Sequence, residues 1–162
     1  MAKVRIRMAK PEELIEIASI VLDAFVGETN KHISNLEKSS ECSHQKFYND
    51  YMNVTRAESR VPFIIYIAEL NDEIIGIAGG AVDEHPWSNI RWGSEDFWFV
   101  KKEHRGSKAG LLLFNKLMDW FKKNKAERIH MTHYTWNNKV EKFYTKKGFV
   151  PFETSYVYKV GE

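Results

Sequence analysis

Two apolar runs separated by a short turn set the first limit on the fold of this chain. Pro62–Leu70 and Ile74–Val82 are rich in β-branched and aromatic residues, and Asn71-Asp72 between them is a turn signal. They predict an antiparallel hairpin. A third run, Glu95–Lys101, predicts another strand after a loop over 83–94. Helices elsewhere in the chain must therefore pack on a sheet.

Other periodic segments place helices and further strands around this hairpin. Val4–Met8 alternates apolar and basic residues and predicts a short strand. Arg128–Thr135 and Val157–Val160 predict the last strands. Helical spacing predicts four helices, from Pro11 to an end at Gly27, from about Ser43 to Val54, from Leu111 to Phe121 and from Asn137 to Lys147. The order predicts an α/β or mixed α+β domain over residues 1–162, with a central mixed sheet.

Three glycines interrupt the second strand of the hairpin. Gly76, Gly79 and Gly80 each weaken a strand, because glycine offers no side chain to pack and loses the most backbone freedom. We interpret them as the mark of a β-bulge or of a close approach by another group.

Composition and charge exclude several classes of protein. No apolar run approaches the roughly 20 residues that span a bilayer, and charges stand where a signal peptide needs an apolar region. We expect a cytoplasmic protein with no membrane contact. The single cysteine, Cys42, excludes an internal disulfide, and a formal net charge of +2 gives no reason to expect a nucleic-acid partner. His130 and His133 would point to opposite faces of a strand, so we predict no metal site.

The segment between the third strand and its helix has the features of a phosphate-binding loop. Glycine and serine precede the helix, and a helix start offers unpaired backbone N–H groups together with the positive end of the helix dipole. Arg105 and Lys108 add positive charge. An ordinary tight turn at a helix start would show the same pattern. Neither a nucleotide triphosphate loop nor a dinucleotide-binding fingerprint is present in the sequence.

A second feature lies near the C-terminus, where Phe143-Tyr144 is followed by Gly148-Phe149. A tyrosine on a helix close to a strand end can donate a proton from its hydroxyl, which has an ordinary pKa of about 10. A half-buried tyrosine in the core is the plainer interpretation of the same residue.

Taken together and in this order, the two features resemble the GNAT superfamily of N-acetyltransferases over nearly the whole chain. In that family the loop reads Arg or Gln, two residues, Gly, one residue, then Gly or Ala. Arg105 and Gly110 match, while Lys108 stands in place of the first motif glycine. The second pattern is matched at the positions Asn137, Val140, Phe143-Tyr144 and Gly148-Phe149.

The resemblance implies a twisted mixed sheet whose parallel strands Glu95–Lys101 and Arg128–Thr135 splay apart around acetyl-CoA. It implies that Tyr144 protonates the departing thiolate. It also implies that coenzyme A contacts these residues: Phe99, Val100, Arg105, Gly106, Ser107, Lys108, Ala109, Gly110, Leu111 and Asn137.

The reaction needs a neutral amine, so a base or a water chain must remove a proton from the acceptor. Glu95 and Asp96 begin the third strand, near where some family members place a carboxylate, although a solvated strand edge would look the same. We expect segments 27–44 and 83–93 to wall the acceptor site, with Asp83, Glu84, Trp87 and Trp92 contacting a cationic amine.

Three functions remain open on the sequence. The first is acetyl transfer to a small-molecule or protein amine, with a homodimer possible. The second is a non-catalytic sensor or scaffold of the same fold that binds acyl-CoA, against which the presence of both Asn137 and Tyr144 argues. The third is a nucleic-acid-binding module, which the weak net charge disfavours.

Overall fold

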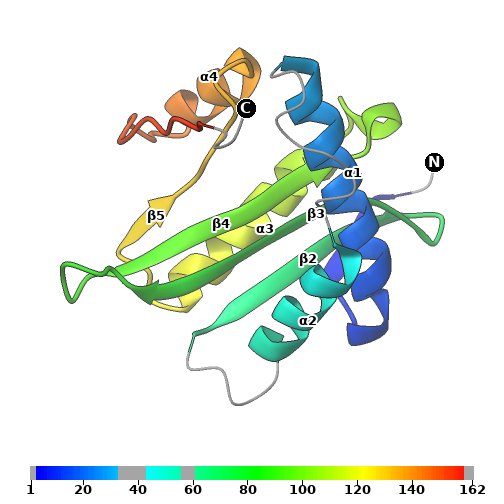
Figure 1. Cartoon of the computed structure of the whole chain (residues 1–162), viewed down its shortest axis with the longest axis horizontal. Coiled ribbons are helices and arrows are strands. Elements are labelled where there is room, and N and C mark those ends of the chain that lie inside the picture. The colour runs from blue at the N-terminus through cyan, green and yellow to red at the C-terminus, as the bar shows by residue number, and fades with distance from the viewer. Residues whose placement is uncertain (1–2, 33–42, 56–60, 159–162) are drawn as a thin grey trace.

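The computed structural model describes residues 3–32, 43–55 and 61–158. Its centre is one five-stranded sheet in the order β1-β2-β3-β4-β5 (Figure 1). The first four strands pair antiparallel and β5 pairs parallel to β4. The strands are β1 (Arg5–Met8), β2 (Phe63–Leu70), β3 (Glu73–Glu84), β4 (Arg91–Val100) and β5 (Arg128–His130). The predicted mixed sheet is therefore confirmed.

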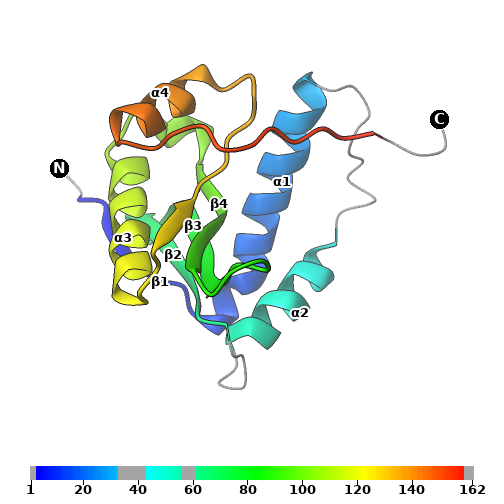
Figure 2. The same ribbon diagram turned by 90° about the vertical axis from the view of Figure 1, so that its left-hand side faces the viewer.

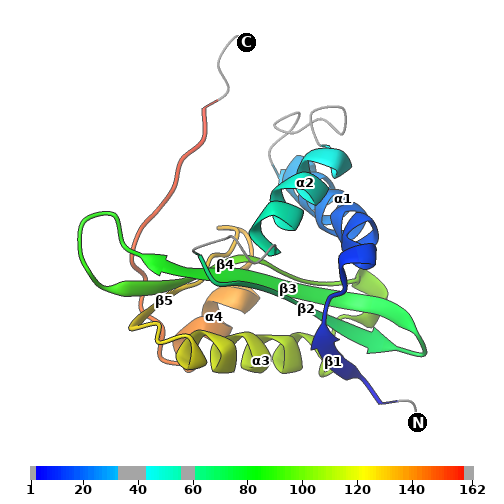
Figure 3. The same ribbon diagram turned by 90° about the horizontal axis from the view of Figure 1, so that it is seen from below.

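Helices cover both faces of this sheet. Seen along the sheet, α1 and α2 lie on one face, and α3 and α4 lie on the other (Figure 3). The helices are α1 (Leu14–His32), α2 (His44–Thr55), α3 (Ala109–Lys123) and α4 (Asn138–Lys146), with short 3₁₀ turns at Pro11–Glu13 and Lys102–His104. None of the described helices is long and apolar enough to cross a bilayer.

Strand β2 is apolar from Phe63 to Ala68 because both of its faces are buried there. Ile65 and Ile67 pack in the cluster under α1 and α2, whereas Ile64, Tyr66 and Ala68 pack in the cluster under α3. Alternate residues of a strand point to opposite faces, so a strand covered on both sides needs an unbroken apolar run.

The glycines of β3 mark a bulge in the neighbouring strand, as predicted. Gly79 pairs with Phe97 and Gly80 pairs with Glu95, so Asp96 is an extra residue on β4. A Cβ on Gly79 would lie 2.6 Å from the Phe97 ring, and one on Gly80 would meet the Ser94 carbonyl oxygen and lie 2.9 Å from the Phe121 ring. Glycine lets the strands approach closely around the bulge.

The pairing of β4 with β5 ends early. It runs from Trp92–Arg128 to Ser94–His130 and stops one residue before Glu95. Beyond that point the chain that follows β5 turns away toward α4, while β4 continues along β3 (Figures 1 and 2). The two parallel strands therefore separate at the residue where the bulge begins.

Several predicted boundaries were wrong. Helix α1 continues through Gly27 to His32, because one exposed glycine in a helix costs only about 1 kcal/mol relative to alanine. Residues 83–94 are not a loop, since β3 and β4 extend toward each other and leave only a turn over 85–90. Strand β5 ends at His130, not Thr135. Val157 and Tyr158 lie in no strand, and residues 159–160 lie outside the described residues, as does Cys42.

We predict that Gly80→Ala destabilises the fold by about 1–3 kcal/mol, because its methyl group would meet backbone in β4 and the Phe121 ring. Gly27→Ala is the matched control. A Cβ there meets nothing within 4 Å, and alanine is the better helix former, so this variant should gain about 0.5–1 kcal/mol. Urea denaturation of both variants measures the two signs, and equal stability of Gly80→Ala and the parent would contradict the close approach.

Candidate functional site

The loop between β4 and α3 presents unpaired backbone donors. The N–H groups of Gly106, Lys108, Gly110 and Leu111 have no acceptor among the described residues, whereas the Ala109 N–H donates to Ser107 Oγ at 3.2 Å. Gly106 has a φ of +89°, which favours glycine. Because Lys108 is the N-cap of the 15-residue helix α3, these donors lie at the positive end of its dipole. The loop can hold an anion.

Arg105 lies beside this loop with its side chain engaged on three sides. Its guanidinium nitrogens lie 3.4 Å from Glu28 Oε1 of α1, and its Nε donates to the Val100 carbonyl at 3.1 Å. The group also lies over the Phe99 ring, 5.2 Å from the ring centre. Arg105 therefore ties the end of β4 to the last turns of α1.

The edge of β4 beyond Glu95 is open on the side away from β3. Lys101 donates its N–H to the Ile75 carbonyl on β3, so the backbone polar groups of the preceding residue, Val100, point to the opposite edge. Within the described residues, the Val100 carbonyl accepts there from the Arg105 side chain alone. An extended ligand could therefore hydrogen-bond to this edge.

Glu95 occupies the point where β4 and β5 separate. Its side chain is half-buried, and Oε2 accepts hydrogen bonds from the Thr132 N–H at 3.1 Å and from the Thr132 hydroxyl at 3.4 Å. Burial raises the pKa of Glu95 to about 7, and the neighbouring charge of Asp96 adds to the effect, while the Thr132 hydrogen bonds oppose it. A carboxyl group with this pKa can accept a proton near neutral pH.

Asp96, the extra residue of the bulge, turns toward α2. Its Oδ2 accepts a hydrogen bond from the Tyr51 hydroxyl at 3.3 Å. Burial raises the pKa of Asp96, and the hydrogen bond from Tyr51 lowers it. The two carboxylates of the predicted pair thus have different partners on different elements.

Tyr144 is buried on α4, with 6% of its surface exposed, and its hydroxyl donates to the Thr132 carbonyl at 3.2 Å. Burial raises the pKa of Tyr144, and the charge of Glu95 raises it further. The hydroxyl is therefore protonated at neutral pH. The predicted acid and base both contact Thr132.

An aromatic cluster fixes α4 against α3 and β4. The Trp98 ring lies 5.5 Å from Phe143 and 6.0 Å from Tyr144, and Phe114 of α3 lies 4.9 Å from Phe143. The Trp98 indole also donates to the Gly110 carbonyl at 3.1 Å. Trp98 therefore contacts both the first turn of α3 and the ring of Tyr144.

Asn137 begins α4 as its N-cap. Its side-chain oxygen accepts from the Val140 N–H at 3.4 Å, a cap that satisfies one free donor of the helix start. Asn137 thus has a structural role in this helix, and its contact with a cofactor stays a prediction.

The residues predicted to contact an acceptor are only partly brought together. Asp83 pairs with Trp92, so both lie on the α1 and α2 face of the sheet, where Trp92 stacks on His85 at 4.7 Å. Glu84 lies on the opposite face. Trp87 is 87% exposed in the turn between β3 and β4. The residues 33–42 of the other predicted wall lie outside the described residues.

Four residues contact the site residues that the sequence predicted, but nothing in the sequence marks them as functional: Glu28, Tyr51, Trp98 and Thr132. Tyr51 has the helical spacing of a core residue of α2, and Trp98 lies in an aromatic run typical of any buried strand. Thr132 acts mainly through its backbone, so its residue type gives little information.

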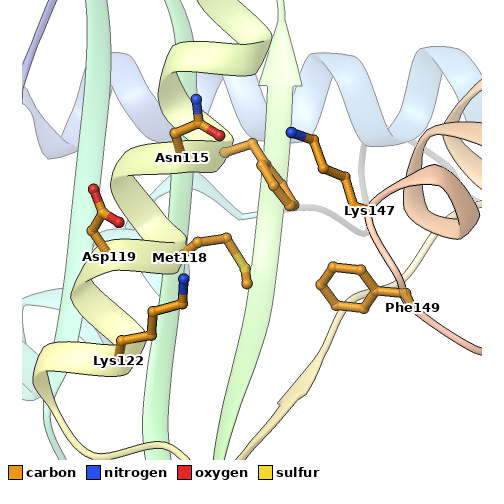
Figure 4. A pocket seen from close by; sticks show the side chains of 7 residues that line it. Asn115, Met118, Asp119, Lys122, Lys147 and Phe149 are labelled. Atoms are coloured by element: carbon orange, nitrogen blue, oxygen red, sulfur yellow. The ribbon is translucent and has the colours of Figure 1, made fainter.

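A surface hollow of about 420 Å³ lies elsewhere, between α3 and the residues that follow α4 (Figure 4). Asn115, Met118, Asp119, Lys122, Lys147 and Phe149 line it together with Phe114. None of the predicted site residues is among them, and its charges are of both signs.

Residues 28–149 match the model of the acetyltransferase (GNAT) family. No curated protein sequence matches the chain.

Solved structures share its fold. A transcriptional regulator from Bacillus halodurans C-125 superposes with a TM-score of 0.75 at 14% identity, covering 97% of this chain and 99% of its own. A predicted acetyltransferase with acetyl-CoA from Clostridium acetobutylicum gives 0.71 at 20% identity, with coverages of 98% and 97%. An aminoglycoside acetyltransferase from an uncultured soil metagenomic sample gives 0.68 at 14%, with the same coverages. At these identities the likeness shows the fold alone.

The position of Glu95 predicts a pH-dependent stability. A carboxyl group whose folded pKa is raised from 4.5 to about 7 contributes stability below pH 4.5 that is lost as the pH rises through about 7. Glu95→Gln removes this loss and keeps an acceptor for Thr132. We therefore expect the difference in melting temperature between the Glu95→Gln variant and the parent to grow in favour of the variant by a few degrees as the pH rises from about 4.5 to 8. A difference that does not change with pH would contradict the raised pKa.

Proposed function

Since this chain belongs to the acetyltransferase (GNAT) family, we propose that it transfers an acetyl group from acetyl-CoA to an amine by direct attack of the amine. The observation that carries the proposal is the junction of β4, β5 and α4. There, a carboxyl group with a pKa of about 7 and a buried tyrosine hydroxyl contact the same residue, beside a loop with free backbone donors.

The β4–α3 loop suits the pyrophosphate of coenzyme A. We assign the phosphates to the free backbone N–H groups of this loop, those of Gly106, Lys108, Gly110 and Leu111, with the charges of Arg105 and Lys108 nearby. Val100, and with it Phe99, would contact the pantetheine arm along the open edge of β4, where the Val100 backbone faces away from β3. When bound, the thioester supplies the activated acetyl group.

Glu95 is the general base of this proposal. An amine with an ordinary pKa of about 10.4 is charged at neutral pH, and a carboxylate with a pKa near the working pH is suited to take its proton. Asp96 lies next to Glu95 in the bulge, but it is held by Tyr51 and is the second candidate.

Tyr144 is the general acid. Its raised pKa keeps the hydroxyl protonated until a stronger base than solvent is present, and the sulfur of a departing thiolate is such a base. To reach that sulfur, the hydroxyl must release the Thr132 carbonyl, to which it donates at 3.2 Å.

The acceptor is open, and both a small molecule and a protein amine fit the proposal. Asp83 and Trp92 share the face beside the bulge and would contact a cationic amine through charge and ring. A cytoplasmic location, one domain over 1–162 and a homodimer stay predictions from the sequence.

A non-catalytic acyl-CoA sensor is the second candidate. It would need the phosphate loop but no base, and it gives no reason for the pKa of a carboxyl group at the strand separation to be raised to about 7. Cofactor binding without thiol release from any amine would favour the sensor.

The phosphate assignment predicts that Gly110→Asp weakens coenzyme A binding at least about tenfold, because a carboxylate would enter the anion site at the helix start. Gly110→Ala separates bulk from charge. Its Cβ would lie 3.6 Å from Val100 Cγ2, an ordinary contact, so it should weaken binding far less. Titration calorimetry measures both affinities. Equal affinity of the aspartate variant and the parent would place the phosphates elsewhere.

The function itself is tested by thiol release from acetyl-CoA against a panel of amines, with the parent and Tyr144→Phe compared. The phenylalanine ring keeps the packing on Trp98 and removes the proton donor, so turnover should fall by about 10²-fold or more, while affinity for acetyl-CoA changes little. Loss of thermal stability together with cofactor binding would instead indicate a folding defect. A stable variant that turns over at the parent rate, with chemistry limiting both, would remove Tyr144 from the mechanism.

A further inference from the structure

Thr132 hydrogen-bonds to both Glu95 and Tyr144. It lies two residues beyond the last β4–β5 pair, where the chain has left the sheet. Its N–H and hydroxyl donate to Glu95 Oε2 at 3.1 and 3.4 Å, and its carbonyl accepts from the Tyr144 hydroxyl at 3.2 Å. One residue thus bridges the two groups that the proposed reaction needs.

We propose that Thr132 is a positioning residue. It bonds to both the base and the acid of the proposed reaction, so that proton uptake by Glu95 and proton release by Tyr144 are coupled. This inference rests on the proposed function. Thr132 itself touches neither substrate in this proposal and acts through the two groups that it orients.

The proton balance of acetyl transfer explains why coupling matters. The ammonium group gives one proton to Glu95, the nitrogen–carbon bond forms and the carbon–sulfur bond breaks. The sulfur takes the Tyr144 proton, the second proton of the nitrogen returns to the tyrosinate through solvent, and Glu95 releases its proton to solvent. The sum is an amide, a thiol and one free proton.

The charge of Glu95 links the two transfers. Ionised Glu95 raises the pKa of Tyr144, so the tyrosine becomes a better acid once Glu95 has taken up the proton of the amine. Other groups face the pair as well. Asp96 on β4 raises the pKa of Glu95, Tyr51 on α2 holds Asp96, and the ring of His133 lies 6.2 Å from the ring of Tyr144.

The Thr132 hydroxyl is the part of this arrangement that a substitution can remove alone. Thr132 is exposed, so Thr132→Val keeps the shape and both backbone hydrogen bonds without disturbing the core. Ionised Glu95 loses one donor, and its pKa should rise. Thr132→Ser keeps the hydroxyl and is the matched control.

The test compares the pH dependence of kcat/KM for the parent and both variants, with the best amine of the panel. In Thr132→Val the pKa of the acidic limb should rise by about half a pH unit to one pH unit. At a pH below this pKa, kcat/KM should therefore be about three- to tenfold lower than in the parent, and at a pH above it kcat/KM should stay near the parent value. Thr132→Ser should restore the parent profile. Melting temperature and coenzyme A affinity should not change.

Carbon-13 NMR titration of the Glu95 carboxyl group measures the same shift without turnover, so the inference can be tested even if no acceptor on the panel reacts. An unmoved Glu95 midpoint in Thr132→Val, or equal shifts in the valine and serine variants, would overturn the role of the hydroxyl. Parent activity in stable Glu95→Gln and Tyr144→Phe variants would instead overturn the proposed chemistry, whatever the behaviour of Thr132.

Discussion

The extra residue in β4 is the constraint on which the rest of the site depends. With Asp96 bulged out opposite Gly79 and Gly80, β4 changes direction just where its pairing with β5 ends. A regular β4 would continue to pair with β5 and close the edge that lies between them. The bulge leaves the Val100 backbone facing an open edge and brings Glu95 within hydrogen-bonding distance of Thr132.

Because β4 and β5 separate early, each side of the separation must be held in place by contacts other than strand pairing. On the β4 side, α3 packs on β3 through Leu113, Leu117 and Phe121, which are almost fully buried. On the β5 side there is little sheet to hold the chain, because only three residue pairs remain. The aromatic cluster around Trp98 replaces that pairing, since it packs α4 directly on β4 and α3.

The sequence is informative where function depends on residue type and uninformative where it depends on backbone geometry. Arg105, Gly110 and Tyr144 stand out in the sequence as candidates, because a phosphate loop and a proton-donating hydroxyl would need those residues at a fixed spacing. The glycines of β3 predicted the bulge, because only glycine tolerates such close approach. The end of the β4–β5 pairing at His130 and the contacts of Thr132 with Glu95 and Tyr144 could not be predicted. Both are set mainly by backbone hydrogen bonds that almost any residue can make.

The continuation of α1 beyond Gly27 has the largest consequence among the predictions that were wrong. The residues gained include Glu28, which binds Arg105 on the β4 side, and His32, which stacks on Trp136 at 4.4 Å on the β5 side. The last turns of α1 therefore contact both sides of the strand separation. A pyrophosphate held at the β4–α3 loop would attract Arg105 away from Glu28, because a group with two negative charges competes strongly with one carboxylate at 3.4 Å.

The Glu28 carboxylate would then have to remain charged with one cation fewer. Burial opposes its ionisation, but Lys31 and Arg105 outweigh burial and lower the pKa of Glu28. Once Arg105 has turned to a phosphate, Lys31 is the cation that still pairs with Glu28. A ligand bound at the loop would thus act on α1 through one ion pair, and α1 contacts the opposite side of the strand separation through the stack of His32 on Trp136.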